Sequence, residues 1–239
     1  MNIDQSQMAN RGTITTMSVE KSTYQTSDTA SRIIHAAEKL FAEQGFKETT
    51  MRQITSQADV NLAAVNYHFG SKQGLIQSVA QHSLNPLCDA IDAGLDAFNV
   101  QQQTPGLDAL LQILARALVR VHQRNDYSLA VLMRLLDQAY RPIQQELQGF
   151  IRAEYGTRIS VFLHYLRQQA MPLSEREFFW RLHFLMGSVI FTLSNMHALI
   201  ALDQPGAEPD AAAEVEHILQ RMVPFICAGM AAPERVEAH

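Results

Sequence analysis

The chain has 239 residues, a formal net charge of −5, 47% hydrophobic residues and 18% charged residues. This length and apolar content suit one large or two small folded domains, and they exclude a chain that is disordered throughout. The acidic balance excludes binding of nucleic acid through bulk charge alone, although it permits a local basic surface. Because Cys88 and Cys227 are too few for a disulfide framework, we expect buried thiols in a reducing compartment.

The N-terminal residues 1–27 are rich in Ser, Thr, Gln and Asn and have no apolar period. They are predicted to be a disordered leader. They also lack the apolar core of an export signal, and the most apolar stretch, residues 182–193, is too short to cross a bilayer. We therefore expect a cytoplasmic protein that has no membrane partner.

Helical signals begin at residue 28. Apolar residues recur at helical spacing from Ile33 to Phe41, and Gly45 ends this first helix. Thr50, with Gln53 three residues later, forms a capping-box pattern that begins a short second helix. Residues 59–61 break that helix and predict a tight turn before the third.

The rest of the chain is predicted to be helical as well, with Gly, Pro or capping residues at the ends of the segments. No segment alternates as a strand, so we predict an all-α fold of about nine helices. The later helices are expected at residues 62–69, 72–98, 107–122, 127–140, 143–170, 174–200 and 211–230. We expect a helix-turn-helix domain over 28–82, a regulatory domain over 83–230 and a tail over 231–239.

The helix at 62–69 carries the main functional signal. At 100° per residue, Leu62, Val65 and Phe69 share one face and should be buried. The outer face then holds two alanines, an asparagine, a tyrosine and a histidine, whereas a solvated helix usually carries Lys, Glu and Gln. Small side chains let a helix approach base edges in the major groove of DNA. The alternative is an ordinary short helix of a bundle, because helix-turn-helix geometry also occurs in proteins that do not bind DNA.

Three segments carry a family resemblance: residues 36–46 (AAEKLFAEQGF), 49–54 (TTMRQI) and 60–72 (VNLAAVNYHFGSK). Together they resemble the DNA-binding domain of TetR-family repressors. This resemblance implies an all-helical regulatory domain, operator DNA as a partner, a homodimer and a small-molecule effector. Residues 133–136, 179–184 and 222–225 further resemble the PsrA type, the fatty-acid-responsive regulators of bacterial lipid metabolism. The implied effector is a long-chain fatty acid or acyl-CoA that releases a repressor from DNA.

The resemblance and the helical wheel together predict the DNA contacts. Arg52 matches a position that reads a base, and the side chains of Tyr67, His68 and Lys72 match positions near phosphates. Thr50 is expected to cap the second helix, and its hydroxyl can also reach a phosphate. Arg52 could instead be a simple surface charge, and His68 could serve packing alone. The full predicted set is Thr50, Arg52, Asn61, Ala63, Ala64, Asn66, Tyr67, His68, Ser71 and Lys72.

The last two long helices are candidates for the dimer interface, because each carries an apolar face. The predicted interface residues are Gly187, Ile190, Phe191, Ser194, Met222, Phe225 and Ile226. The alternative is that these side chains fill the core of a single chain. Arg134, Arg181 and His183 are candidates for binding the anionic end of an effector, although an internal partner such as Asp137 or Glu177 could neutralise either arginine.

Enzymatic function is not expected. The chain has no GxSxG, no HExxH and no glycine-rich phosphate loop, and its nine histidines lack metal-ligand spacing. We therefore expect no cofactor and no metal. The competing hypothesis is a regulator of the same fold with a different ligand, or one that is switched by a protein partner.

Overall fold

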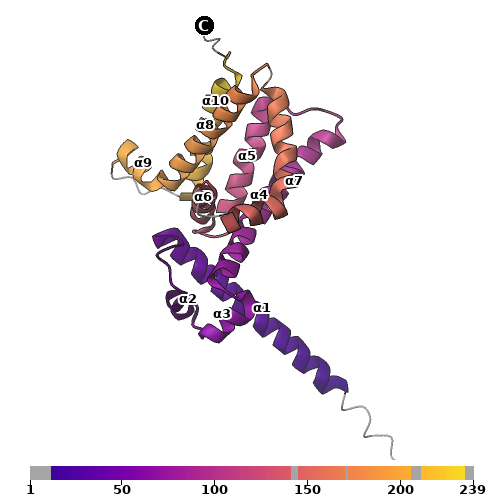
Figure 1. Ribbon diagram of the computed structural model, residues 1–239, viewed down its shortest axis with the longest axis vertical. Coiled ribbons are helices and arrows are strands. Elements are labelled where there is room, and N and C mark those ends of the chain that lie inside the picture. The colour runs from indigo at the N-terminus through magenta and orange to yellow at the C-terminus, as the bar shows by residue number, and fades with distance from the viewer. Residues whose placement is uncertain (1–11, 141–144, 171, 206–210, 235–239) are drawn as a thin grey trace, which may run out of the picture. The chain divides into compact units, whose positions relative to one another are not determined.

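The computed structural model describes residues 12–140, 145–170, 172–205 and 211–234 (Figure 1). These residues form ten α-helices and no strand, which confirms the all-α prediction. The helices are α1 (Gly12–Gln44), α2 (Met51–Ala58), α3 (Leu62–Phe69), α4 (Lys72–Val100), α5 (Leu107–His122), α6 (Ser128–Ala139), α7 (Gln145–Gln169), α8 (Glu175–Ser194), α9 (Met196–Asp203) and α10 (Ala211–Ala231). The chain divides into two compact units, Met1–Val79 and Ala80–His239, so the division falls three residues before the expected one.

Several helix ends differ from the predictions by one or two residues, and two segments differ by more. Residues 12–27, expected to be disordered, form the first half of α1, and residues 1–11 lie outside the described residues. The predicted helix over 174–200 is broken at Asn195 into α8 and α9, which are bent by 74°. The Asn195 side chain donates to the Phe191 carbonyl at 2.8 Å, and the Asn195 N–H donates to the same carbonyl at 3.1 Å. Asn195 leaves the helical conformation, at φ −113° and ψ 14°, and its side chain caps the last turn of α8.

The core of unit 1 joins α1, α2 and α3. Ile33 and Phe41 of α1, Ile54 of α2 and Val65 of α3 are completely buried. The Phe41 ring also contacts the Phe46 ring, whose centroid is 4.7 Å away. These contacts fix the short helices against α1.

The core of unit 2 centres on α5. Its residues Leu110, Ile113, Ala117 and Val121 recur at helical spacing and are all buried, and α10 packs along the same helix. A Cβ on Gly94 of α4 would lie 2.8 Å from Ile113 Cγ2, so α4 and α5 approach closely at this point. Among the described residues no single helix is long and apolar enough to span a membrane, and only the bent pair of α8 and α9 reaches that length and composition together.

Candidate nucleic-acid interface and regulatory sites

The helix-turn-helix of unit 1 is built by local capping. Thr50 Oγ1 accepts from the Gln53 N–H at 3.3 Å, and the Gln53 side chain accepts from the Thr50 N–H at 2.8 Å, which is the predicted capping box. Asp59 then ends α2 in the left-handed conformation at φ 52°. Asn61 caps α3 because its Oδ1 accepts from the Ala64 N–H at 2.9 Å. The turn between α2 and α3 is therefore fixed by the sequence of residues 59–61.

The outer face of α3 is largely exposed. Ala63 and Asn66 are exposed, and Tyr67 is 79% exposed, whereas Val65 is completely buried. The prediction that Leu62 is buried is wrong, since its side chain is 51% exposed, and Phe69, also predicted to be buried, is half-buried. Leu62 is the first residue of α3, so it lies at the turn end of the helix, whereas Val65 lies one turn further into the core.

The remaining predicted contacts surround this face. His68 is half-buried, and its ring is edge-on to the Tyr67 ring at 5.1 Å and tilted against the Phe69 ring at 5.9 Å. Packing against these rings therefore contributes to the position of His68, which is the alternative role considered for it above. Arg52 is exposed, and its guanidinium has no hydrogen-bond or ion-pair partner among the described residues.

The start of α4 supplies a cation and a cap. Ser71 Oγ accepts from the Gly74 N–H at 3.0 Å, and Lys72 Nζ donates to the Lys47 carbonyl at 3.5 Å. Burial lowers the pKa of the Lys72 ammonium, and nearby Glu48 partly opposes that shift. A Cβ on Gly74 would lie only 2.1 Å from the Phe69 carbonyl oxygen. The end of α3 and the start of α4 therefore approach so closely that a residue with a side chain at position 74 would clash with the backbone.

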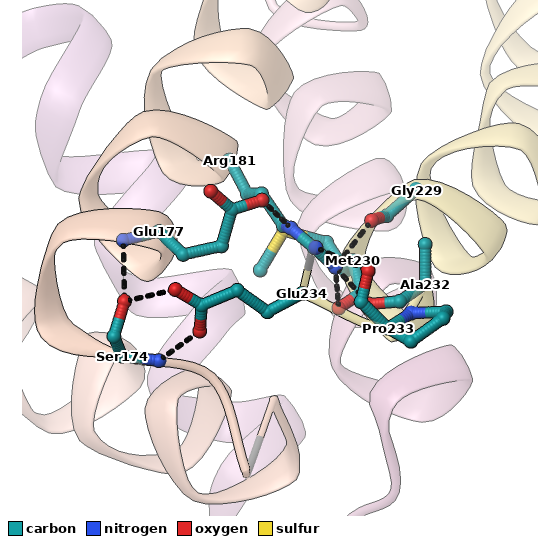
Figure 2. A network of polar contacts seen from close by, with 8 residues as sticks. All are labelled: Ser174, Glu177, Arg181, Gly229, Met230, Ala232, Pro233 and Glu234. Carbon is teal, nitrogen blue, oxygen red and sulfur yellow. Dashed lines mark hydrogen bonds and ion pairs between the residues drawn. The ribbon is translucent and has the colours of Figure 1, made fainter. Parts of the chain in front are cut away.

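Arg181 occupies a site that the sequence did not predict. Its side chain is 8% exposed, and Figure 2 shows its guanidinium pointing at the C-terminal end of α10. Nε donates to Glu177 Oε1 at 2.8 Å, so the internal partner considered above is present. Nη1 donates to the carbonyl oxygens of Gly229 at 3.0 Å, Met230 at 3.2 Å and Ala232, and Nη2 reaches that of Pro233 at 3.4 Å. These acceptors occupy the guanidinium, so Arg181 caps the C-terminal end of α10, and its assignment as an effector ligand stays a prediction.

The expected tail is also partly ordered. Ala231 belongs to α10, and Glu234 accepts from the Ser174 N–H at 2.7 Å and from Ser174 Oγ at 2.6 Å (Figure 2). Residues 232–234 are thus attached to the N-terminus of α8, and residues 235–239 lie outside the described residues.

The other two candidate effector ligands have different surroundings. Arg134 is exposed on α6 between the buried Met133 and Leu135, so it lacks the burial that made it a candidate. His183 Nδ1 lies 2.6 Å from the Phe179 carbonyl oxygen of its own helix, and its ring contacts the rings of Phe179 and Tyr140. The assignment of Arg134 and His183 as effector ligands therefore stays a prediction.

The predicted dimer residues divide between surface and core. Gly187, Phe191 and Ser194 of α8 and Phe225 of α10 are exposed, with Phe191 at 62% and Phe225 at 71%. Ile190 and Met222 are half-buried. Ile226 is only 8% exposed, so it belongs to the core of the subunit, as the alternative held. The α8 and α10 helices contact each other, so the two exposed aromatic rings belong to neighbouring helices.

Two family models match this chain. The model described as bacterial regulatory proteins of the tetR family matches residues 33–79, and a tetracyclin repressor-like C-terminal domain matches residues 112–229. The chain belongs to the TetR family. The first match covers the helix-turn-helix of unit 1, and the second covers most of the helices of unit 2.

Curated transcriptional regulators are similar to parts of this chain. The HTH-type transcriptional regulator YttP of Bacillus subtilis is 31% identical over 97 residues, which are 41% of this chain and 45% of YttP. An HTH-type transcriptional repressor of Mycobacterium tuberculosis is 28% identical over 155 residues, which are 65% of this chain and 73% of the repressor. The chain thus spans less than half of the first relative.

A solved TetR-like transcriptional regulator from Rhodococcus is similar in fold. Its TM-score is 0.57 at 18% identity, and the match covers 86% of this chain and 97% of that one. At this identity the similarity establishes the fold alone.

Proposed function

We propose that this protein is a transcriptional regulator that binds a pseudo-palindromic operator as a homodimer. The observation that carries this proposal is the exposed face of α3, on which Ala63, Asn66 and Tyr67 project from a capped helix-turn-helix. A recognition helix enters the major groove with such a face, and small residues permit close approach. Residues 29–82 carry five cations against four acids, too few to hold DNA through one unit, so two units share the binding.

The contacts divide into positioning and reading. Lys72, Tyr67 and His68 bind phosphates, as do the N-terminal amides of α4 that follow Ser71. Arg52 reads a base, because its free guanidinium can donate two hydrogen bonds to a guanine. Asn66 reaches a base edge or a phosphate, and the methyl groups of Ala63 and Ala64 contact thymine methyls. Thr50 and Asn61 act mainly as caps, and the Thr50 hydroxyl is close enough to the surface to reach a phosphate.

The dimer forms through the exposed aromatic rings of α8 and α10. Phe191 and Phe225 would be covered by the same helices of a second copy, as in a four-helix bundle about a two-fold axis. Gly187 and Ser194 are exposed and small, which permits close helix contact. The expected result for Phe191→Glu with Phe225→Glu is a monomer in sedimentation experiments, with weakened operator binding.

The effector is proposed to be a fatty acid or acyl-CoA that releases a repressor from genes of lipid metabolism. The support is the resemblance of residues 133–136, 179–184 and 222–225 to fatty-acid-responsive regulators. Operator affinity titrated with acyl compounds of increasing length tests it. Unchanged affinity across the series would favour a different ligand or a protein partner.

Operator DNA for these tests comes from sequencing the genomic fragments that the purified protein retains. Lys72→Ala should weaken binding evenly across sequences and lower the salt slope by about one. Arg52→Ala should instead relax the preference at one base pair per half-site, costing about 1–3 kcal/mol. Arg152→Ala, an exposed cation of unit 2, is the control for net charge. Identical specificity profiles for the first two variants would contradict the division into positioning and reading residues.

A further inference from the structure

A groove of about 860 Å³ lies within unit 2 between α4, α5 and α10. Residues 85–94 of α4 form one wall, and the C-terminal half of α5 with residues 123 and 124 of the turn after it forms another. The α10 helix contributes Glu216, Leu219 and Gln220. None of the predicted effector ligands lines it. Its chemistry is therefore independent of the sites considered above.

Three arginines line the wall formed by α5 and the turn after it. Arg116 and Arg120 are spaced four residues apart and lie on one face of α5, Arg124 lies in the turn two residues beyond the end of the helix, and all three are exposed. Arg124 Nη2 lies 2.5 Å from His82 Nε2, which accepts when the imidazole is neutral. Arg116 and Arg120 have no ion-pair or hydrogen-bond partner among the described residues. Like charges at this spacing repel, so an anion between them would stabilise the wall.

The acids of the groove do not balance these arginines. Asp89 already accepts from Arg158 Nη2 at 2.7 Å, and Arg158 Nε binds Asp92 at the same distance. Glu216 of α10 is then the other acidic residue that lines the groove. Residues 83–239 contain 12 arginines against 17 acids, so a wall with three arginines is a local departure from an acidic background.

Small apolar side chains line the groove beside the arginines. Those of α4 are Ala90 and Ala93, next to Gly94, and those of α5 are Ala115 and Val119, with Leu219 from α10. The short side chains leave room for the body of a ligand along the groove. A ligand that satisfies both surfaces has an anionic head group and an apolar body.

We propose that this groove binds an anionic amphiphile, whose carboxylate or phosphate lies on Arg116 and Arg120 and whose apolar body lies along Ala90, Ala93 and Val119. Guanidinium groups bind either anion with paired hydrogen bonds. As the site of the effector this inference rests on the proposed function, but binding itself is measured without DNA. It assigns the anion to α5 rather than to Arg134 or Arg181.

The test is calorimetric titration of the full chain with octanoate, octanoyl-CoA and octylamine. One or both anionic probes should bind, and octylamine should bind at least tenfold more weakly. Tighter binding of octanoate identifies a carboxylate as the head group, and tighter binding of octanoyl-CoA identifies the phosphates of the carrier. The double variant Arg116→Gln with Arg120→Gln should bind the anionic probe at least tenfold more weakly, whereas Arg152→Gln on α7 should leave the affinity unchanged. Both groove arginines are exposed, so unfolding is not expected, and circular dichroism checks this.

A second variant tests the apolar strip. Ala93 is exposed, so Ala93→Phe should fill the groove without disturbing the core, and it should lower the affinity for the same probe at least tenfold. Failure of both anionic probes to bind overturns the inference, as does binding that is indifferent to both groove variants. If a probe binds the groove and operator affinity does not change, the site stands and the effector part of the proposed function fails.

Discussion

Replacing Arg181 by methionine should destabilise unit 2 by about 3 kcal/mol. The substitution keeps a long side chain in a position that is 8% exposed, but it removes the guanidinium. Glu177 then loses its partner at 2.8 Å, and the carbonyl groups of Gly229 and Met230, at the end of α10, lose theirs at 3.0 and 3.2 Å.

The magnitude follows from burial. Removing one partner of a buried ion pair costs about 3–5 kcal/mol, and a hydrogen bond to a charged group contributes about 1.5–3 kcal/mol, without simple additivity. The Glu177 side chain is 33% exposed, so water can replace part of the lost interaction and the low end applies. At about 2–4 °C per kcal/mol for a unit of this size, the unfolding midpoint should fall by about 6–12 °C.

The assay is thermal unfolding followed by circular dichroism at 222 nm, with urea unfolding as a second measure. Arg176→Met, an exposed neighbour, is the matched control and should stay within about 0.5 kcal/mol of the unmodified protein. Glu177→Gln keeps an acceptor for Arg181, so its loss of stability should lie between those of Arg176→Met and Arg181→Met. If Arg181→Met and Arg176→Met unfold at the same temperature, the guanidinium does not stabilise the end of α10 and the argument fails.

Other predictions concern caps, packing and thiols. Asn61→Ala removes the side-chain cap of α3 and should cost about 1 kcal/mol in urea unfolding, whereas Asn61→Asp, which keeps an acceptor, should not. Gly94→Ala places a Cβ 2.8 Å from Ile113 Cγ2 and 2.9 Å from Ile113 Cγ1, and it should cost about 1–3 kcal/mol. In an Ile113→Ala background, which lacks both γ-carbons, the same change should cost less. Burial raises the pKa of Cys88 to about 11 and, to a smaller extent, that of Cys227, so iodoacetamide at pH 8 should modify the half-buried Cys227 first in peptide mass mapping. Cys88 should become reactive only as the pH approaches 11, and equal rates at pH 8 would contradict this assignment.

The sequence predicted those elements whose boundaries are set by nearby residues. The structure has α3 at the predicted 62–69 because Asn61 caps its start and Gly70, at φ 70°, ends it. The boundaries of α5 agree with 107–122 for a similar reason, since Gly106 precedes the helix and its buried residues have a clear period. These signals act over a few residues and can be read without tertiary structure.

The failures share a physical cause. The first half of α1 has no apolar period to reveal it, and the break at Asn195 depends on a side chain that binds its own helix. Arg181 was a candidate ligand because a partly buried arginine needs an anionic partner. Its carbonyl acceptors near residue 230 are about fifty residues away, and no local pattern connects them to it. By contrast, Arg116 and Arg120 of the predicted helix at 107–122 are visible as a spacing of four, and that spacing could have identified a charged face.

The attachment of residues 232–234 to α8 limits where the chain can be cut or extended. A protein shortened after Met230 would lose the Ala232 and Pro233 carbonyls that Arg181 binds, and the Glu234 carboxylate would no longer hold the Ser174 amide. An affinity tag or fluorescent protein fused at that point would replace these acceptors with foreign chain. A fusion that retains Glu234 keeps every one of these bonds, so reporter fusions intended to follow the protein in cells belong beyond it.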